Sequence, residues 1–228
     1  MTEASSDAII RMFHVHKRYG AKSALKDVTL DIPKNEFLFV TGRSGAGKTT
    51  LLRLLYLAET TSEGQILVDG MNLSRIARDR VPYLRRKFGI IFQDYKLIAT
   101  KTVFENVALV LEAAGRKPSL IAKKVKSMLR LVGMEDRMDA YPRSLSGGEQ
   151  QRVAVARAAA GDPGIILADE PTGSLDEEAA ATIMNFLDTF HQRGSTVIVA
   201  THDKNLMNRT HSRIVQLRDG RLWTSESA

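Results

Sequence analysis

The hydrophobic pattern of the chain predicts several buried strands. Short, almost wholly apolar runs are typical of strands that are covered on both faces. Such runs lie at residues 36–41, 88–92, 165–168 and 195–200. Three further segments, 9–19, 25–32 and 65–70, also have the composition of strands, and a short loop that contains Gly20 joins the first two. Residues 213–223 have the pattern of a hairpin that turns at Asp219 and Gly220.

Helical segments lie between these strands. Good helix formers follow Thr50, and helices are also expected over 153–160 and 177–193. Apolar residues at roughly helical spacing predict two amphipathic helices, 102–115 and 119–132, which would form a lobe between two core strands. The buried faces of these two helices would consist of Val103, Val107, Val110, Leu111, Leu120, Val125, Met128 and Leu129. The alternation of buried strands and helices predicts an α/β fold.

A glycine-rich loop between a predicted strand and a predicted helix carries the first chemical signal. Residues 42–49 fit the pattern G-x-x-x-x-G-K-S/T, in which backbone N–H groups surround phosphate oxygens. The candidate ATP-binding residues here are Gly42, Arg43, Ser44, Gly45, Ala46, Gly47, Lys48, Thr49 and Thr50. Lys48 would reach the β- and γ-phosphates, and the Thr49 hydroxyl would ligate Mg²⁺. The alternative is a turn with a chance Lys-Thr pair, but the flanking strand and helix favour a nucleoside triphosphate.

Polar side chains follow three of the predicted core strands. These residues are Gln93, Asp169, Glu170 and His202. Ligands of open α/β sheets gather at the carboxyl ends of the strands. We expect Gln93, and Asp169 through water, to hold Mg²⁺, and Glu170 to act as general base on the attacking water. A lone histidine is more often structural, but the position of His202 at this edge favours a contact with the γ-phosphate.

A second helix start suited to an anion is expected near residue 147. Ser146 and Glu149 have the S-x-x-E spacing of a capping box. Gly147 and Gly148 lie between them, although glycine weakens a helix. An ordinary capped helix does not explain this glycine pair. Glycines leave the N–H groups of the first turn uncovered, so this helix start favours the binding of an anion.

Composition narrows the classes of function. The 228 residues include no cysteine, which excludes disulfides, Cys-ligated zinc and thiol catalysis. The chain begins without a secretory signal pattern, and no apolar run approaches the ~18 residues of a membrane span, so we expect a cytoplasmic protein. The net charge of +7 favours an anionic partner such as a nucleotide or an acidic membrane face. The basic residues form small clusters without interleaved aromatics, so no nucleic-acid partner is expected.

In their order along the chain, these motifs resemble the nucleotide-binding subunits of ABC systems. The matching set is Tyr19, 42–49, Gln93, 145–149, 165–170, 174–176 and His202. The resemblance implies a P-loop ATPase of the ABC type, with a RecA-like core, an N-terminal antiparallel β-subdomain and an inserted α-helical subdomain. The single domain would span 1–228, with the core and β-subdomain at about 1–93 and 161–228 and the helical subdomain at about 94–160.

The same resemblance implies roles for the remaining site residues. Tyr19 would stack on the adenine, and Asp176 would belong to the D-loop, in which Ser174 stands where Asn is frequent. Two copies would pack head to tail around two ATP molecules. The signature residues, which would face the ATP bound to the other copy, are Ser146, Gly147, Gly148 and Glu149. ATP would close this homodimer, and hydrolysis at Glu170, with Lys48 and His202, would let it open.

Two segments, 85–94 and 102–108, are similar to the FtsE subfamily of cell-division ATPases. This similarity implies an integral membrane partner of the FtsX type, which relays the ATP cycle to cell-wall hydrolases. The protein would then be peripheral on the inner face of the cell membrane. The alternative is a lipoprotein-releasing or MacB-like export ATPase, because these relatives share the core motifs. A protein that acts on DNA or ribosomes is less favoured, because the chain has no second cassette and no long coiled-coil insertion.

Overall fold

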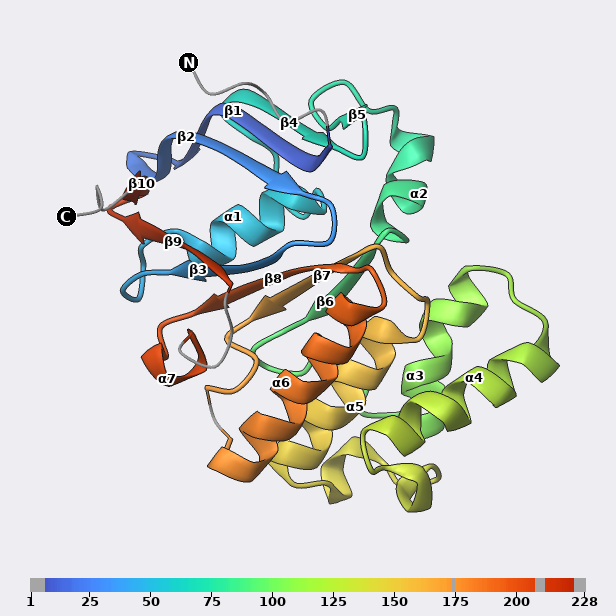
Figure 1. Cartoon of the computed structure of the whole chain (residues 1–228). Coiled ribbons are helices and arrows are strands. Elements are labelled where there is room, and N and C mark those ends of the chain that lie inside the picture. Colours follow the sequence, from blue (N-terminus) through green and yellow to red (C-terminus); the bar gives the residue numbers. More distant parts are fainter. Residues whose placement is uncertain (1–6, 174, 208–211, 224–228) are drawn as a thin grey trace. The chain divides into compact units, whose positions relative to one another are not determined.

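The computed structural model describes residues 7–173, 175–207 and 212–223 (Figure 1). The chain divides into two compact units, which are described separately below. The first unit comprises Met1–Arg85 and Ile198–Ala228, and the second comprises residues 86–197. The boundary at residue 198 falls inside strand β8 (Thr196–Thr201). The predicted helical lobe lies within the second unit, and the exact subdomain bounds stay a prediction.

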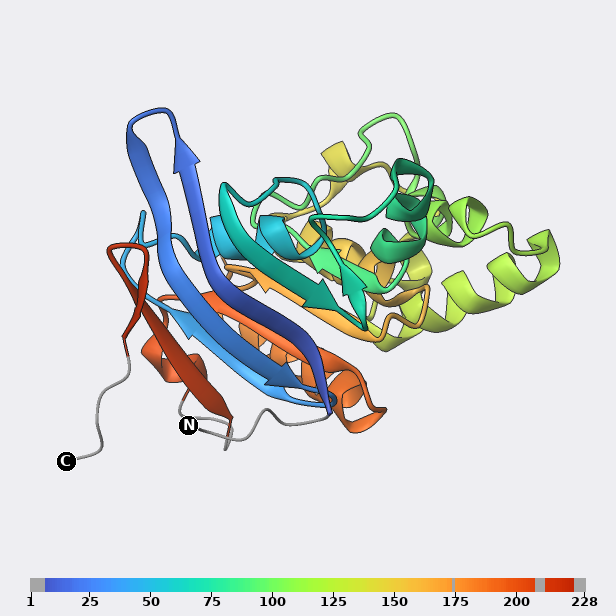
Figure 2. The same cartoon turned by 90° about the horizontal axis from the view of Figure 1, so that it is seen from above.

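The first unit contains an antiparallel sheet with the strand order β2-β1-β4-β5. Its strands are β1 (Ala8–Tyr19), β2 (Lys22–Pro33), β4 (Glu63–Val68) and β5 (Met71–Asn72). Met12 of β1 pairs with Leu30 of β2 and with Ile66 of β4, and all three are buried. Figure 2 shows β1, β2 and β4 side by side. This sheet matches the predicted N-terminal strands.

The first unit also contains the strand that leads into the glycine-rich loop. Every residue of β3 (Phe37–Thr41) is buried, and β3 runs parallel to β9 (Arg213–Arg218). The hairpin predicted at Asp219 and Gly220 is confirmed, because β9 pairs antiparallel with β10 (Arg221–Trp223). Helix α1 (Lys48–Leu55) buries its leucines and lies between β3 and the antiparallel sheet (Figure 1). The remaining helices of this unit are η1 (Arg78–Arg80), α2 (Val81–Arg85) and α7 (Lys204–Met207).

The second unit packs helices on a parallel pair of strands, β6 (Phe88–Ile91) and β7 (Ile165–Asp169). Its helices are α3 (Val103–Ala113), α4 (Pro118–Leu131), η2 (Glu135–Arg137), η3 (Pro142–Ser144), α5 (Gly147–Ala159) and α6 (Glu177–Gln192). Helix α5 contacts α3, α4, α6 and β6. Gly89 allows the close approach of α5 to β6, because a Cβ there would lie 2.3 Å from the Ala158 carbonyl oxygen. Helix α5 is therefore the central helix of this unit.

One detail of the helical predictions is wrong. Leu120 was expected in the core, but it is 55% exposed, and Ile121 takes the buried position. Ile121, Val125, Met128 and Leu129 keep the spacing of a single helical face, which places Leu120 outside the buried stripe. Helix α5 begins at Gly147, as its capping box indicated, and continues through the apolar run 153–160 to Ala159.

Candidate nucleotide-binding site

The glycine-rich loop (residues 42–47) owes its shape to contacts with neighbouring strands. Gly42 has φ 148°, and a Cβ there would lie 2.3 Å from the Leu217 carbonyl oxygen of β9. Gly47 has φ 109°, and its Cβ would lie 2.6 Å from the Ala24 carbonyl oxygen of β2. No side chain fits at either position without moving the backbone. The loop therefore packs closely against β9 at Gly42 and against β2 at Gly47. Within the loop, the Ala46 N–H donates to the Arg43 carbonyl at 3.0 Å.

Lys48 and the start of α1 supply positive charge at this loop. The Lys48 side chain is buried, and its Nζ donates to the Gly42 carbonyl oxygen at 2.9 Å, so the ammonium group lies over the loop. The N-cap Gly47 has no side chain to accept from the first turn, and that turn holds no acidic residue. The N–H groups of the helix start and the ammonium group together form a strong anion site. Thr49 and Thr50, in the same turn, are half-buried.

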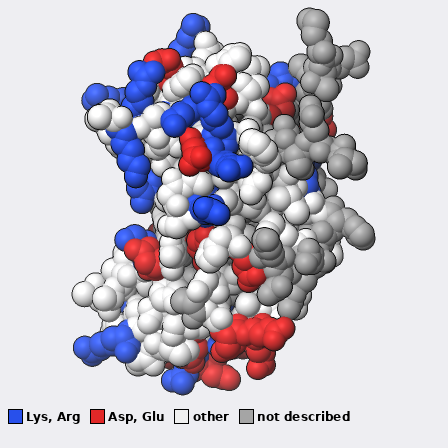
Figure 3. Space-filling view, turned by 90° about the vertical axis from the view of Figure 1, so that its left-hand side faces the viewer, with Lys and Arg blue, Asp and Glu red and all other residues white. Residues whose placement is uncertain are grey.

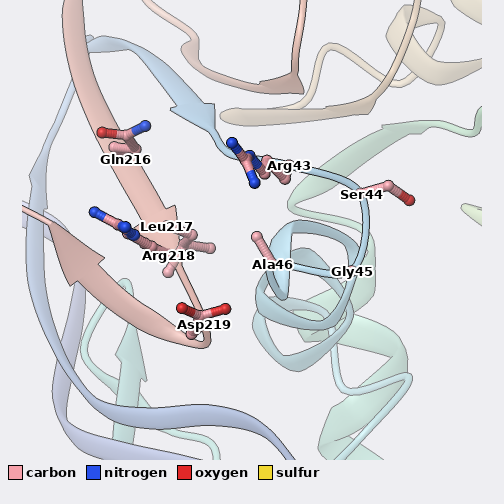
Figure 4. A pocket seen from close by; sticks show the side chains of 8 residues that line it. All are labelled: Arg43, Ser44, Gly45, Ala46, Gln216, Leu217, Arg218 and Asp219. Atoms are coloured by element: carbon pink, nitrogen blue, oxygen red, sulfur yellow. The ribbon is translucent and has the colours of Figure 1, made fainter.

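A hollow of about 460 Å³ opens beside the loop. Arg43, Ser44, Gly45 and Ala46 line it from the loop, and Gln216, Leu217, Arg218 and Asp219 line it from β9 and its turn (Figure 4). The Arg43 and Arg218 side chains are exposed. Lys and Arg side chains also gather on the surface of the first unit in Figure 3. Two arginines and one aspartate line the hollow, and their net positive charge favours an anionic ligand.

Tyr19 ends β1 in the first unit and is 41% exposed as a residue. The Lys17 Nζ lies 4.8 Å from the ring centroid and 2.8 Å from a carboxylate oxygen of Glu59. The hydrogen bond from Lys17 lowers the pKa of Glu59. The ring is thus held by a cation on one side and is accessible to solvent, as a stacking residue requires. His202 also belongs to this unit and follows β8, the strand next to β3.

The register of β6 and β7 brings Gln93 and the acidic pair to one edge of the second unit. Ile91 pairs with Ala168 in a parallel ladder. Gln93 and Glu170 each lie two residues beyond this pair, so they emerge at the same end of the two strands. Gln93 is exposed, whereas Asp169 and Glu170 are half-buried. Glu170 has φ 46°, an uncommon conformation for a residue other than glycine, and its carbonyl accepts from the Gly173 N–H at 3.3 Å. Such strain is frequent at functional sites.

The capping box predicted at the start of α5 is confirmed. The Glu149 N–H donates to the Ser146 Oγ at 3.2 Å, and the Ser146 N–H donates to Glu149 Oε2 at 2.8 Å. This second bond holds the pKa of Glu149 below its usual value. Gly147 is exposed and Gly148 is half-buried, so the first turn is accessible between the two capping residues. Asp176 is the N-cap of α6 and accepts from the Ala179 N–H at 2.8 Å, while Ser174 lies outside the described residues.

Two polar residues of α5 make contacts that the sequence did not indicate. The buried Gln151 donates to the Pro171 carbonyl at 2.7 Å, which ties α5 to the loop after Glu170. Arg157 donates to the carbonyls of Tyr95 and Lys96, just after Gln93. The only sign of Arg157 in the sequence is that a charged residue interrupts the apolar run 153–160. Among the described residues, no helix is long and apolar enough to cross a bilayer.

The comparisons with known proteins give the family. The model of the ABC transporter family matches residues 25–173. This chain therefore belongs to the ABC transporter family, as an ATPase with the α/β P-loop fold of that family. Its relatives include the cell division ATP-binding protein FtsE of Bacillus subtilis, 42% identical over 96% of each chain. FtsE of Escherichia coli is 44% identical over 94% of this chain and 97% of its own length.

Solved structures of ABC cassettes have the same fold. A dimeric ATP-binding cassette in a post-hydrolysis state, bound to ADP and Pi, is 35% identical and has a TM-score of 0.88, with 95% of this chain and 97% of that chain covered. A second dimeric ABC transporter cassette has a TM-score of 0.89 at 36% identity, over 94% of this chain and 97% of that chain. The resemblance to ABC ATPases and to the FtsE subfamily is confirmed.

Proposed function

We propose that this protein is the ATP-hydrolysing subunit of an FtsEX-like complex in cell division. ATP-driven closure of its dimer acts on an integral membrane partner of the FtsX type, which regulates cell-wall hydrolases. The observation that carries the proposal is the 42% identity to FtsE over 96% of both chains. The protein would be cytoplasmic and would bind the inner face of the cell membrane through this partner.

The hydrolytic step follows from the chemistry of the site residues. Glu170 accepts a proton from the water whose oxygen attacks the γ-phosphorus, and the bond to the β–γ bridging oxygen breaks to give ADP and Pi. Lys48 and the N–H groups of the loop bind the phosphate oxygens on which negative charge collects. His202 donates a hydrogen bond to the γ-phosphate, and Tyr19 stacks on the adenine.

Mg²⁺ fits the donor atoms that we assign to it. It would be held by the Thr49 hydroxyl, the Gln93 amide oxygen and, through water, the Asp169 carboxylate, and it would neutralise charge on the β- and γ-phosphates. All three donors are oxygen atoms, which Mg²⁺ prefers. The described residues contain no group of three or more His, Cys, Asp or Glu that could hold a metal. Mg²⁺ sites that depend on nucleotide phosphates commonly use only one or two carboxylates.

The start of α5 supports a composite site in a head-to-tail dimer. Its capped first turn exposes N–H groups of Gly147 and Gly148, which suit a γ-phosphate bound to the other copy. Two of the solved cassettes that resemble this chain are dimers. We propose that each ATP lies between the loop 42–49 of one copy and Ser146, Gly147, Gly148 and Glu149 of the other, with Asp176 nearby in the D-loop.

A matched pair of cap variants separates the structural and functional roles of Ser146. Thr102 caps α3 with the same geometry, in which the Glu105 N–H donates to Thr102 Oγ1 at 3.2 Å. Ser146→Ala and Thr102→Ala should each lower the free energy of unfolding by about 1 kcal/mol, measured by denaturant titration. Only Ser146→Ala should also weaken ATP-dependent dimerisation on a sizing column. An equal effect of both variants on dimerisation would remove Ser146 from the proposed interface.

The experiment that tests the function is affinity capture with the Glu170→Gln protein. Native membranes are solubilised in detergent with Mg-ATP, and the recovered proteins are identified. Recovery of a small FtsX-like membrane protein with a large extracytoplasmic domain supports the division function. Recovery of a lipoprotein-releasing or drug exporter keeps the ATPase and replaces division by export. Recovery of no membrane protein contradicts the proposal. Lys48→Ala is the matched control, and it should capture neither the FtsX-like protein nor an exporter.

A further inference from the structure

The turn directly after Gln93 has an unusual backbone conformation. Tyr95 has φ 58° and Lys96 has φ 51°, so two consecutive residues other than glycine have a left-handed backbone conformation. L-amino acids disfavour this conformation, and it persists where the surroundings impose it. Local bonds give part of the constraint, since the Tyr95 N–H donates to the Phe92 carbonyl at 3.3 Å and Lys96 Nζ lies 2.6 Å from an Asp94 carboxylate oxygen.

Arg157 of α5 supplies a long-range constraint on this turn. Its guanidinium donates to the Tyr95 carbonyl at 2.7 Å and to the Lys96 carbonyl at 2.6 Å. The planar guanidinium group presents two N–H donors in a fixed geometry, which suits two adjacent carbonyls in a way that a lysine cannot reproduce. Arg157 is half-buried, and this burial lowers the pKa of its guanidinium group.

The side chain of Tyr95 reaches the other end of α5. A Cβ built at Gly147 would lie 2.9 Å from the Tyr95 hydroxyl oxygen and 3.9 Å from Cζ. The turn is therefore in contact with α5 at two places, through its carbonyls at Arg157 and through its phenol at Gly147. Gly147 is exposed at the helix start, where the absence of a side chain leaves room for the hydroxyl.

We propose that Tyr95 and Arg157 are positioning residues that join the Gln93 segment to the start of α5. This inference rests on the proposed dimer, in which Gln93 serves the ATP bound to its own copy and Gly147 serves the ATP of the other copy. The contact would make the two segments move together within one subunit. Loss of the γ-phosphate at one site would then be transmitted to the donor groups of the other site.

The contact between Tyr95 and Gly147 is tested by suppression. Gly147→Ala should lower kcat about ten-fold, because the new methyl group displaces the hydroxyl, while the Kd of the monomer for ATP stays unchanged. Tyr95→Phe removes the oxygen and leaves Cζ at an ordinary contact distance from the new methyl group. The double variant should therefore recover the part of kcat that is lost through displacement of the hydroxyl. A double variant as inactive as Gly147→Ala would overturn the proposal, because alanine would then be excluded for another reason.

The role of Arg157 is tested with a conservative variant and a matched control. Arg157→Lys should raise hydrogen exchange at the Tyr95 and Lys96 amides about ten-fold and lower kcat without changing the Kd for ATP. Arg130→Lys is the control, because Arg130 of α4 forms an ion pair with Glu135 of η2 and lies away from the turn. Unchanged exchange and kcat in Arg157→Lys would overturn the positioning role. If the wild-type protein does not hydrolyse ATP, the proposed function is contradicted and not the positioning role. Hydrogen exchange at Tyr95 and Lys96 then still tests the contact with Arg157.

Discussion

Lys48→Ala is expected to abolish tight binding of ATP. The Lys48 ammonium group lies over the glycine-rich loop, 2.9 Å from the Gly42 carbonyl, and is buried. Hydrogen bonds to a charged partner contribute about 1.5–3 kcal/mol each, so removal of the ammonium should weaken ATP binding by about two orders of magnitude. Titration calorimetry with ATP in the presence of Mg²⁺ measures the change in Kd.

Two controls show whether a weaker Kd of Lys48→Ala for ATP is caused by loss of the ammonium group. Lys26→Ala alters a lysine of β2 outside the glycine-rich loop and should leave the Kd unchanged. Thermal unfolding of Lys48→Ala without nucleotide checks that the loop still folds, since the Gly42 carbonyl loses one donor. Undiminished affinity in a folded Lys48→Ala protein would refute the assignment of this loop to the phosphates.

The Glu170→Gln variant is expected to bind ATP and to accumulate as the closed, ATP-bound dimer. Glutamine keeps the size of the side chain but accepts a proton poorly, so hydrolysis should fall by about 10²–10⁴-fold. The backbone of Glu170, with φ 46°, accommodates glutamine as it does glutamate. On a sizing column with Mg-ATP the variant should elute as a dimer, whereas the wild type should return to monomers as ATP is consumed.

The control for this variant lies close to it in the sequence. Glu178 is an exposed acid in the first turn of α6, and Glu178→Gln should leave both hydrolysis and elution unchanged. Hydrolysis at the wild-type rate in Glu170→Gln would show that another group is the general base. A monomer that persists with ATP, even after the membrane partner is added, would contradict the sandwich dimer.

Local sequence signals predicted much of this fold. Capping at Ser146, the hairpin at Asp219 and the buried strand before Gly42 depend on residues close together in the sequence, and the structure has all three. The assignment of Glu170 and His202 to catalysis is still a prediction from motif and strand position. Local rules were sufficient wherever a turn, a cap or a run of apolar residues decided the conformation.

Long-range contacts decided what the sequence did not predict. The left-handed turn at Tyr95 accepts a hydrogen bond from an arginine 62 residues further along the chain, and no local pattern indicates that pairing. Leu120 was assigned to the core because it is apolar, yet the packing of α4 selected Ile121. Hydrophobicity alone does not fix the rotation of a helix when two apolar residues are adjacent.

The contact of Gly42 with β9 determines when, during synthesis, the glycine-rich loop can take its final shape. The glycine-rich loop is synthesised before the strand against which it rests, Arg213–Arg218. A nascent chain that lacks this strand has the complete phosphate-binding sequence without its support. We therefore expect tight nucleotide binding only once Arg213–Arg218 has folded against the loop.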